Sequence, residues 1–166
     1  TRLMADNTTQ TIQYVQFENS PSLDELQDEI TVMAWVLPGK QKGMADILAK
    51  GDFIVLQQTG QSLSFFAGGW GQGSCDVPLP KDWENKWHHI AGVCISKVFT
   101  IYINGLKAGS FEVDRTVNLS SRLRWVMGGN EEFPDQRYYN GKINGFKVFA
   151  AALNADEIEE EMLPME

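Results

Sequence analysis

The chain has few cysteines, few basic residues and no long hydrophobic run, and each shortage excludes a class of protein. Cys75 and Cys94 are its only cysteines; they match no CxxC metal or redox pattern and could form one disulfide or none. The formal charge is −8, with 14 Lys and Arg against 22 Asp and Glu. We therefore expect no nucleic-acid partner, because such affinity comes from clustered basic side chains. The apolar run from Met33 to Leu37 is too short to span a bilayer, so we expect no membrane insertion.

Length and composition indicate one globular domain that covers residues 1–166. The chain is 43% hydrophobic and 22% charged, which is ordinary for a protein with a packed core. It begins at Thr1, with no initiator Met and no signal-peptide pattern. We interpret it as a domain excised from a longer protein.

Segments rich in β-branched and aromatic residues recur along the chain, bounded by Gly, Pro, Asn and Asp, whereas helical periodicity is almost absent. This pattern predicts an all-β fold, a two-sheet antiparallel jelly-roll β-sandwich with one short C-terminal helix. The predicted strands are Thr11–Glu18, Ile30–Leu37, Asp46–Lys50, Phe53–Gln57, Ser62–Ala67, Trp87–Ile95, Val98–Asn104, Lys107–Val113, Arg122–Met127 and Lys142–Ala150.

Three local patterns are specific enough to test. Asn104-Gly105 separates two apolar segments and is typical of a two-residue hairpin turn. The segment Ile30–Leu37 is apolar on both faces, which predicts a central strand whose outer face is covered or used. Asn154, followed three positions later by Glu157, predicts a capped helix start.

The order of four motifs resembles the concanavalin A-like lectin/glucanase superfamily, and within it the laminin-G-like domains that accompany bacterial carbohydrate-active enzymes. The motifs are Tyr14–Phe17 with Ile30–Val36, Trp87–Val93, Ile101–Gly105, and Tyr139–Phe149 followed by Ala152–Ile158. The resemblance implies a jelly roll that in many members binds a ligand without catalysis. The same fold also hosts glycosidases, lyases and protein-binding modules, so the function must be argued from the site.

The resemblance also raises the question of calcium, which related sandwiches often hold near the paired first and last strands. This chain has Asn144 where the last strand often carries Asp, although Asp6 and Asn7 could still provide oxygen ligands. We therefore expect that no cofactor is required and assign no metal ligands, while a structural calcium stays an open alternative.

The sequence offers no convincing catalytic group. Glycoside hydrolysis needs two carboxylates held across a cleft, and no strand carries a Glu-x-Asp pair. His88 and His89 are adjacent on a predicted strand, so their side chains point to opposite faces and cannot share a metal.

The strongest candidate for ligand binding is Trp70 in the segment Gly68–Gly73. Flanking glycines permit sharp turns and leave the indole uncrowded, and Gln72 can both donate and accept hydrogen bonds. An aromatic face with planar polar groups suits a pyranose ring. The alternative is that Trp70 folds back onto the core.

The loop Gly128–Tyr138 is the second candidate, because it mixes amide, acidic, guanidinium and aromatic side chains. We select Asn130, Arg137 and Tyr138 from it as ligand contacts, and add Arg124, which the strand alternation places opposite Trp125. A structural salt bridge is the alternative role for Arg124.

The remaining aromatic residues are predicted to be structural. The resemblance places Trp35, Trp87 and Tyr139 in the core, and Trp83 is expected to plug a loop.

The leading hypothesis is a carbohydrate-binding, lectin-like module that contacts an oligo- or polysaccharide. We expect an extracellular, cell-surface or periplasmic location and a covalently linked catalytic domain in the parent chain. A protein-binding adhesion domain is the first alternative. A glycosidase or lyase on the same fold is the second.

Overall fold

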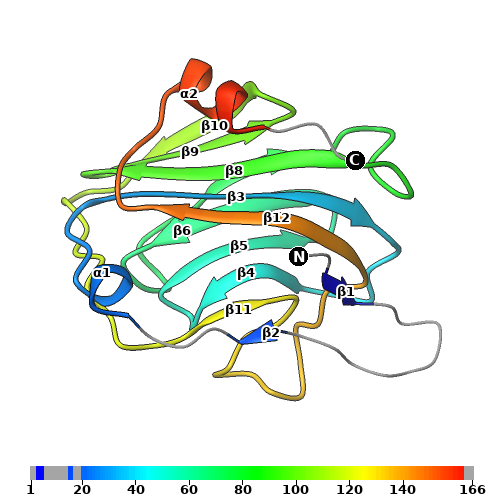
Figure 1. Cartoon of the computed structure of the whole chain (residues 1–166), viewed down its shortest axis with the longest axis horizontal. Helices are drawn as coiled ribbons and strands as arrows, with labels where there is room; N and C mark the ends of the chain where they lie inside the picture. Colours follow the sequence, from blue (N-terminus) through cyan, green and yellow to red (C-terminus); the bar gives the residue numbers. More distant parts are fainter. Residues whose placement is uncertain (1–2, 6–14, 17–19, 163–166) are drawn as a thin grey trace.

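The computed structural model describes residues 3–5, 15–16 and 20–162 as two antiparallel six-stranded sheets packed face to face (Figure 1). Sheet A contains, in spatial order, β1 (Leu3–Ala5), β12 (Gly141–Phe149), β3 (Glu29–Pro38), β8 (His88–Ile95), β9 (Val98–Ile103) and β10 (Leu106–Glu112). Sheet B contains β2 (Val15–Gln16), β11 (Trp125–Met127), β4 (Ala45–Lys50), β5 (Ile54–Thr59), β6 (Ser62–Ala67) and β7 (Cys75–Pro78). The predicted all-β jelly-roll sandwich is confirmed.

The two described helices are short and lie at opposite ends of the sequence. They are α1 (Pro21–Asp24) and α2 (Ala155–Glu161). The capping box predicted for α2 is present: Asn154 Oδ1 accepts from Glu157 N at 2.9 Å, and Glu157 Oε1 accepts from Asn154 N at 3.1 Å. No helix in the described parts of the chain is long and apolar enough to cross a membrane.

The core lies between the sheets and follows from strand alternation. Phe65 of β6 points inward, where its ring packs edge-on against Phe99 of β9 with centroids 5.9 Å apart. It also covers Gly92 of β8, where an added Cβ would lie 2.5 Å from the Phe65 ring. The absence of a side chain at Gly92 therefore sets how closely the sheets approach.

The outer face of sheet A is covered by α2, which explains why β3 is apolar on both faces. Met33, Ala91, Val93 and Ile158 form a second buried cluster, separate from the main core. Figure 1 shows α2 in red beside sheet A. The predicted central strand with a covered outer face is confirmed.

The Asn104-Gly105 hairpin joins β9 and β10 as predicted. Both residues have positive φ, 53° and 80°, as a type I′ turn demands. The Asn104 side chain also bonds outside the turn, since its Oδ1 accepts from His89 N at 2.8 Å.

Other sequence predictions need correction. The strand β7 was missed because Cys75–Pro78 is short and ends in proline. The predicted strand Arg122–Met127 begins only at Trp125. Of the predicted strand Thr11–Glu18, the structure describes Val15–Gln16 and the remainder lies outside the described residues.

We predict that Gly92→Ala destabilises the domain, because the new methyl group would overlap the Phe65 ring. Overpacking of this kind costs about 1–3 kcal/mol. Urea unfolding followed by tryptophan fluorescence measures the loss. Gly43→Ala is the matched control, since a Cβ added at Gly43 would have nothing within 4 Å, and its midpoint should stay at or above that of the wild type. Equal midpoints for the two variants would contradict the assigned role of Gly92.

Candidate functional site

Trp70 lies in the β6–β7 connection and is 72% exposed to solvent. The alternative in which its indole folds back onto the core is therefore wrong. Gln72 is exposed on the same loop, and its Nε2 makes a long 3.5 Å contact with the carbonyl of Gly68.

Glycines hold this loop in shape. Gly68 and Gly73 have φ of 84° and 109°, in the left-handed region. Both also allow a close approach: an added Cβ would lie 3.0 Å from the Val117 side chain at Gly68, and 2.6 Å from the Phe111 ring at Gly73. The glycines therefore anchor the two ends of the loop against the sandwich while Trp70 projects from its middle.

The turn Gly51–Phe53 between β4 and β5 joins this loop to the second candidate loop. On one side, Gly69 N donates to Phe53 O at 3.1 Å. On the other side, Asp52 Oδ1 accepts from Arg137 Nη1 at 2.7 Å, and Asp52 N donates to a carboxylate oxygen of Glu132. The structure thus brings the two loops selected from the sequence to a single turn of sheet B.

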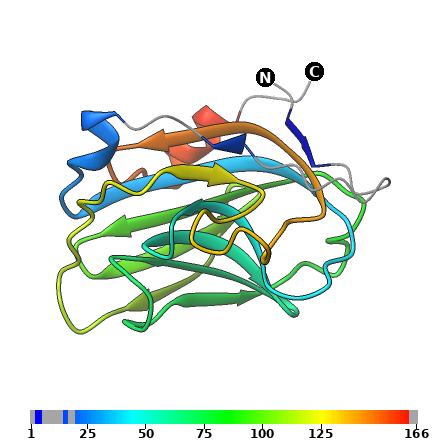
Figure 2. The same ribbon diagram turned by 90° about the horizontal axis from the view of Figure 1, so that it is seen from below.

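The loop 128–138 folds back over sheet B, and Figure 2 shows this yellow to orange segment in front of the sheet's strands. Arg137 anchors the loop. It adopts a positive φ of 62°, its guanidinium lies 3.6 Å from the centroid of the Phe133 ring, and it reaches Asp46 Oδ2 at 3.7 Å as well as Asp52. Only 16% of the side chain is exposed. Nη1 of Arg137 and the face of its guanidinium are therefore engaged within the protein.

Asn130 is the clearest misinterpretation among the predicted contacts. It is buried, with 3% of its surface exposed. Its Nδ2 donates to Asp46 Oδ2 at 2.9 Å and to Gly51 O at 3.0 Å, while its Oδ1 accepts from Glu132 N at 3.0 Å. Because the whole amide is engaged inside the protein, Asn130 fixes the loop and is withdrawn as a ligand contact.

Tyr138 and Arg124 have different surroundings. Tyr138 is half-buried at the end of the loop and has interactions of its own. The backbone N–H of Arg124 donates to Glu131 Oε1 at 2.7 Å, and its Nε lies 3.9 Å from Glu131 Oε2. The structural salt bridge weighed for Arg124 is therefore present, although half of its side chain stays exposed.

Asp46 is a site residue that the sequence reasoning missed. It is fully buried on β4, and this burial raises its pKa to about 6, against the hydrogen bond from Asn130 and the charge of Arg137, which both lower it. The available signal was an acidic residue inside the otherwise apolar segment Ala45–Ala49. A buried carboxyl with a raised pKa beside a loop is a frequent mark of a functional site.

The histidines, the cysteines and Trp83 are all buried. His88 and His89 are both buried. The His88 ring stacks on Trp83 with centroids 4.9 Å apart, and Trp83 Nε1 donates to Gln58 Oε1 at 2.9 Å. Cys75 and Cys94 are buried free thiols.

The expectation that no cofactor is required stays a prediction, and calcium stays an alternative to it. Asp6 and Asn7 lie outside the described residues, and Asn144 lies on β12 opposite Trp35. Within residues 3–5, 15–16 and 20–162, no group of three or more His, Cys, Asp and Glu residues could hold a metal ion.

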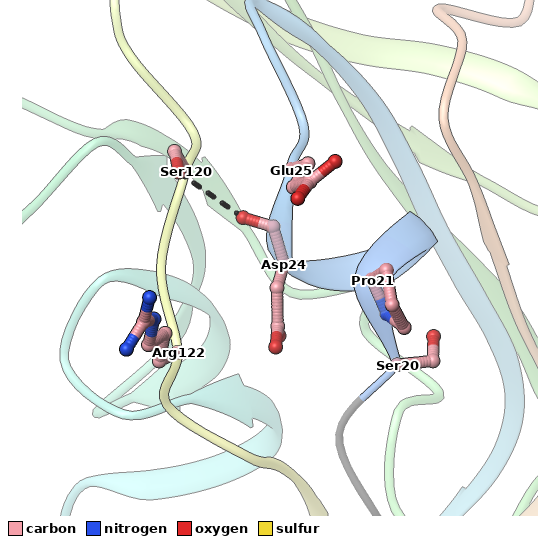
Figure 3. Close-up of a pocket in the computed structure, with 6 residues that line it drawn as sticks. All are labelled: Ser20, Pro21, Asp24, Glu25, Ser120 and Arg122. Atoms are coloured by element: carbon pink, nitrogen blue, oxygen red, sulfur yellow. Dashed lines mark hydrogen bonds between the residues drawn. The ribbon is translucent and has the colours of Figure 1, made fainter.

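A separate hollow of about 310 Å³ lies beside α1 (Figure 3). Its lining residues are Ser20, Pro21, Asp24, Glu25, Ser120 and Arg122. Ser120 Oγ donates to the Asp24 carbonyl at 3.2 Å, which ties α1 to the loop that precedes β11. The fully buried Lys50 stabilises the same region through Asp24 Oδ1 at 2.9 Å and Leu123 O at 2.6 Å. None of the described residues that line this hollow is aromatic.

The comparison with known families agrees with this architecture. A family model described as the concanavalin A-like lectin/glucanases superfamily matches residues 9–159. The chain belongs to this superfamily. The resemblance inferred from the four motifs is thereby confirmed. No curated protein sequence matches the chain significantly.

Solved structures share the fold of this superfamily domain at low sequence identity. A candidate carbohydrate-binding protein from Bacteroides ovatus has a TM-score of 0.71 and 18% identity, over 92% of this chain and 45% of that one. A heptameric SAP-like pentraxin from Limulus polyphemus has a TM-score of 0.67 and 15% identity, over 88% and 79%. Botulinum neurotoxin type C, whose cell entry depends on two ganglioside molecules, has a TM-score of 0.67 and 15% identity, over 89% and 38%. The chain thus spans less than half of the first and third of these.

We predict that Asp46→Asn stabilises the domain at neutral pH and less so in acid. The pKa of Asp46 in the folded state, about 6, exceeds its ordinary value of 3.8. Ionisation therefore opposes folding, and this group's contribution to stability is lost as the pH rises from about 4 through 6. Removing the full cost of ionising Asp46 would raise the free energy of unfolding by about 2–3 kcal/mol. The lost charge attraction between Asp46 and Arg137 reduces this gain.

Thermal unfolding of both proteins at pH 4 and at pH 7.5 measures this effect. The variant's advantage in Tm should be larger at pH 7.5. Burial lowers the pKa of His89 to about 4, which destabilises both proteins in acid and cancels in the difference. An advantage that grew toward pH 4 would contradict the buried, raised-pKa environment of Asp46.

Proposed function

We propose that this domain is a non-catalytic carbohydrate-binding module that stacks a sugar ring on Trp70. The observation that carries the proposal is the 72% exposure of this tryptophan on a glycine-anchored loop. A large exposed aromatic side chain offers apolar area that a ligand can cover on binding. Its position in a loop on a rigid sandwich is typical of a recognition residue.

The surroundings of Trp70 suit a sugar. Gln72 offers an amide on the same loop, and Tyr138 lies at the end of the neighbouring loop. A pyranose presents an apolar C–H face for the indole and hydroxyl groups that such side chains can bond. The likeness to a candidate carbohydrate-binding protein and to a ganglioside-dependent toxin supports this ligand class.

A catalytic role has less support. Asp46, Asp52 and Glu132 are carboxylates brought together at the β4–β5 turn, where Asp46 and Asp52 bind the guanidinium of Arg137 and Glu132 accepts from Asp52 N. Asp46 is also fully buried. Glycoside hydrolysis instead needs two carboxyl groups that face the bond to be cleaved across an open cleft. The glycosidase and lyase alternative therefore ranks below binding.

The protein-binding alternative would use an exposed apolar surface. The large hydrophobic side chains that are exposed in the described parts of the chain are Met44, Trp70, Ile95, Leu106 and Phe111; the last two share β10, and the other three lie on separate strands or connections. This dispersal favours a single stacking residue over a broad apolar interface.

The wider setting belongs to the same proposal. The domain would act outside the cytosol, in an extracellular, cell-surface or periplasmic protein. There it would hold a covalently linked catalytic domain close to an oligo- or polysaccharide. The negative net charge and the short helices are compatible with this role, which requires no cofactor.

We predict that Trp70→Ala lowers glycan affinity at least about tenfold, since loss of an aromatic stack and its buried area removes about 1.4 kcal/mol or more. A glycan array followed by titration calorimetry on the best ligand provides the measurement. Unfolding midpoints should change little, because the indole is mostly exposed.

Leu106→Ala is the matched control, since Leu106 is 75% exposed but lies on the β9–β10 hairpin. It should bind like the wild type. Unchanged glycan affinity in Trp70→Ala would rule out Trp70 as the stacking surface. The absence of any glycan ligand would reject the proposed function itself.

A further inference from the structure

A row of polar side chains crosses the outer face of sheet B. The register pairs Asp46 with Gln57, Gln57 with Ser64, and Ser64 with Asp76, across β4, β5, β6 and β7. The neighbouring residue Phe65 points into the core. Because side chains alternate along a strand, Ser64 and its partners in the row point outward.

The row lies between the two candidate loops. At one end, Asp46 is bonded to Asn130 and lies close to Arg137 of the loop 128–138. At the other end, Asp76 Oδ2 accepts from Ser74 Oγ at 2.8 Å, where the loop that carries Trp70 enters β7. The polar row therefore forms a floor that connects the two loops.

Two buried oxygens of this floor have no donor among the described residues. They are Gln57 Oε1 and Asp46 Oδ1. Gln57 is 7% exposed and Asp46 is fully buried, and the two are direct partners in the register. A buried acceptor without a hydrogen bond costs about 1–3 kcal/mol. Both oxygens could therefore accept a hydrogen bond from a donor that reached them.

We infer that this floor accepts hydrogen bonds from the hydroxyl groups of an uncharged glycan and disfavours carboxylated or sulfated ones. The inference rests on the proposed function and specifies its ligand class. Gln57 is the direct contact, and Asp46 is a positioning residue behind it. A sugar hydroxyl donates one hydrogen bond, which matches an unsatisfied acceptor.

The charges around the floor oppose an acidic ligand. Asp46, Asp52 and Asp76 lie on or beside it, and the nearest guanidinium, Arg137, is already bound to the first two. The chain as a whole carries a formal charge of −8. An anion would therefore meet acceptors and negative potential where it needs donors.

A hydrogen bond within the protein is the alternative to this inference. A protonated Asp46 could donate to Gln57 Oε1 and satisfy both oxygens without a ligand. In that case Gln57 would contribute to stability in acid and nothing to binding. A variant that removes the Gln57 amide separates the two cases.

The test compares Gln57→Leu with Gln61→Leu. The first substitution removes the unsatisfied acceptor with little change of volume, and the second makes the same change on the exposed β5–β6 turn. We expect Gln57→Leu to weaken binding of the best neutral glycan about tenfold, with an unfolding midpoint at pH 5 equal to or above that of the wild type. Gln61→Leu should retain full affinity.

Five outcomes are informative. Arrays of neutral, uronate-bearing and sulfated glycans should give neutral ligands whose affinity changes little between 50 mM and 500 mM salt. Preferred binding of acidic glycans would overturn the inference. So would normal affinity in Gln57→Leu with a lowered midpoint at pH 5. If Trp70→Ala weakens binding but Gln57→Leu does not, the proposed function stands and the inferred role of the floor is rejected. If no glycan binds, both the proposed function and the inference are rejected.

Discussion

The contact of Phe65 with Gly92 is the constraint on which the remaining structure depends. An aromatic ring from sheet B occupies the space that a side chain on β8 would otherwise fill. The missing side chain at Gly92 therefore lets the two sheets approach closely at this point. Because Phe65 must point inward, the strand alternation commits Ser64 and Phe66 to the outer face. A single packing contact in the core thus determines which side chains form the proposed floor.

The β4–β5 turn holds the two candidate loops in place. Gly51 has φ of 53°, and an added Cβ would overlap the Leu123 side chain and lie 2.8 Å from Glu132. This close approach holds the loop 128–138 against sheet B. The same turn bonds Gly69 and so fixes the loop that carries Trp70. A site held in this way loses little conformational entropy on binding, which favours affinity without a large interface.

The sequence predicted features whose causes are local. Ser62–Ala67, the Asn104-Gly105 turn and the helix cap at Asn154 depend on periodicity or on residues a few positions apart, and the structure confirms all three. The exposure of Trp70 was also a local effect, because glycines on both sides remove the neighbours that could cover it.

The misassigned residues depend on contacts between distant segments. Asn130 bonds Asp46 across 84 positions, and Arg137 bonds Asp52 across 85. The composition of a polar loop shows which polar groups are present, but not whether they form hydrogen bonds within the protein. Asp46 escaped notice for the same reason, since its importance comes from partners brought to it by folding. These buried bonds also determine which polar groups remain between the loops. Asn130 Nδ2 and Arg137 Nη1 donate to acceptors within the protein, and unsatisfied acceptor oxygens are left between the loops. A ligand that supplies hydroxyl donors and an apolar ring face then complements both this floor and Trp70.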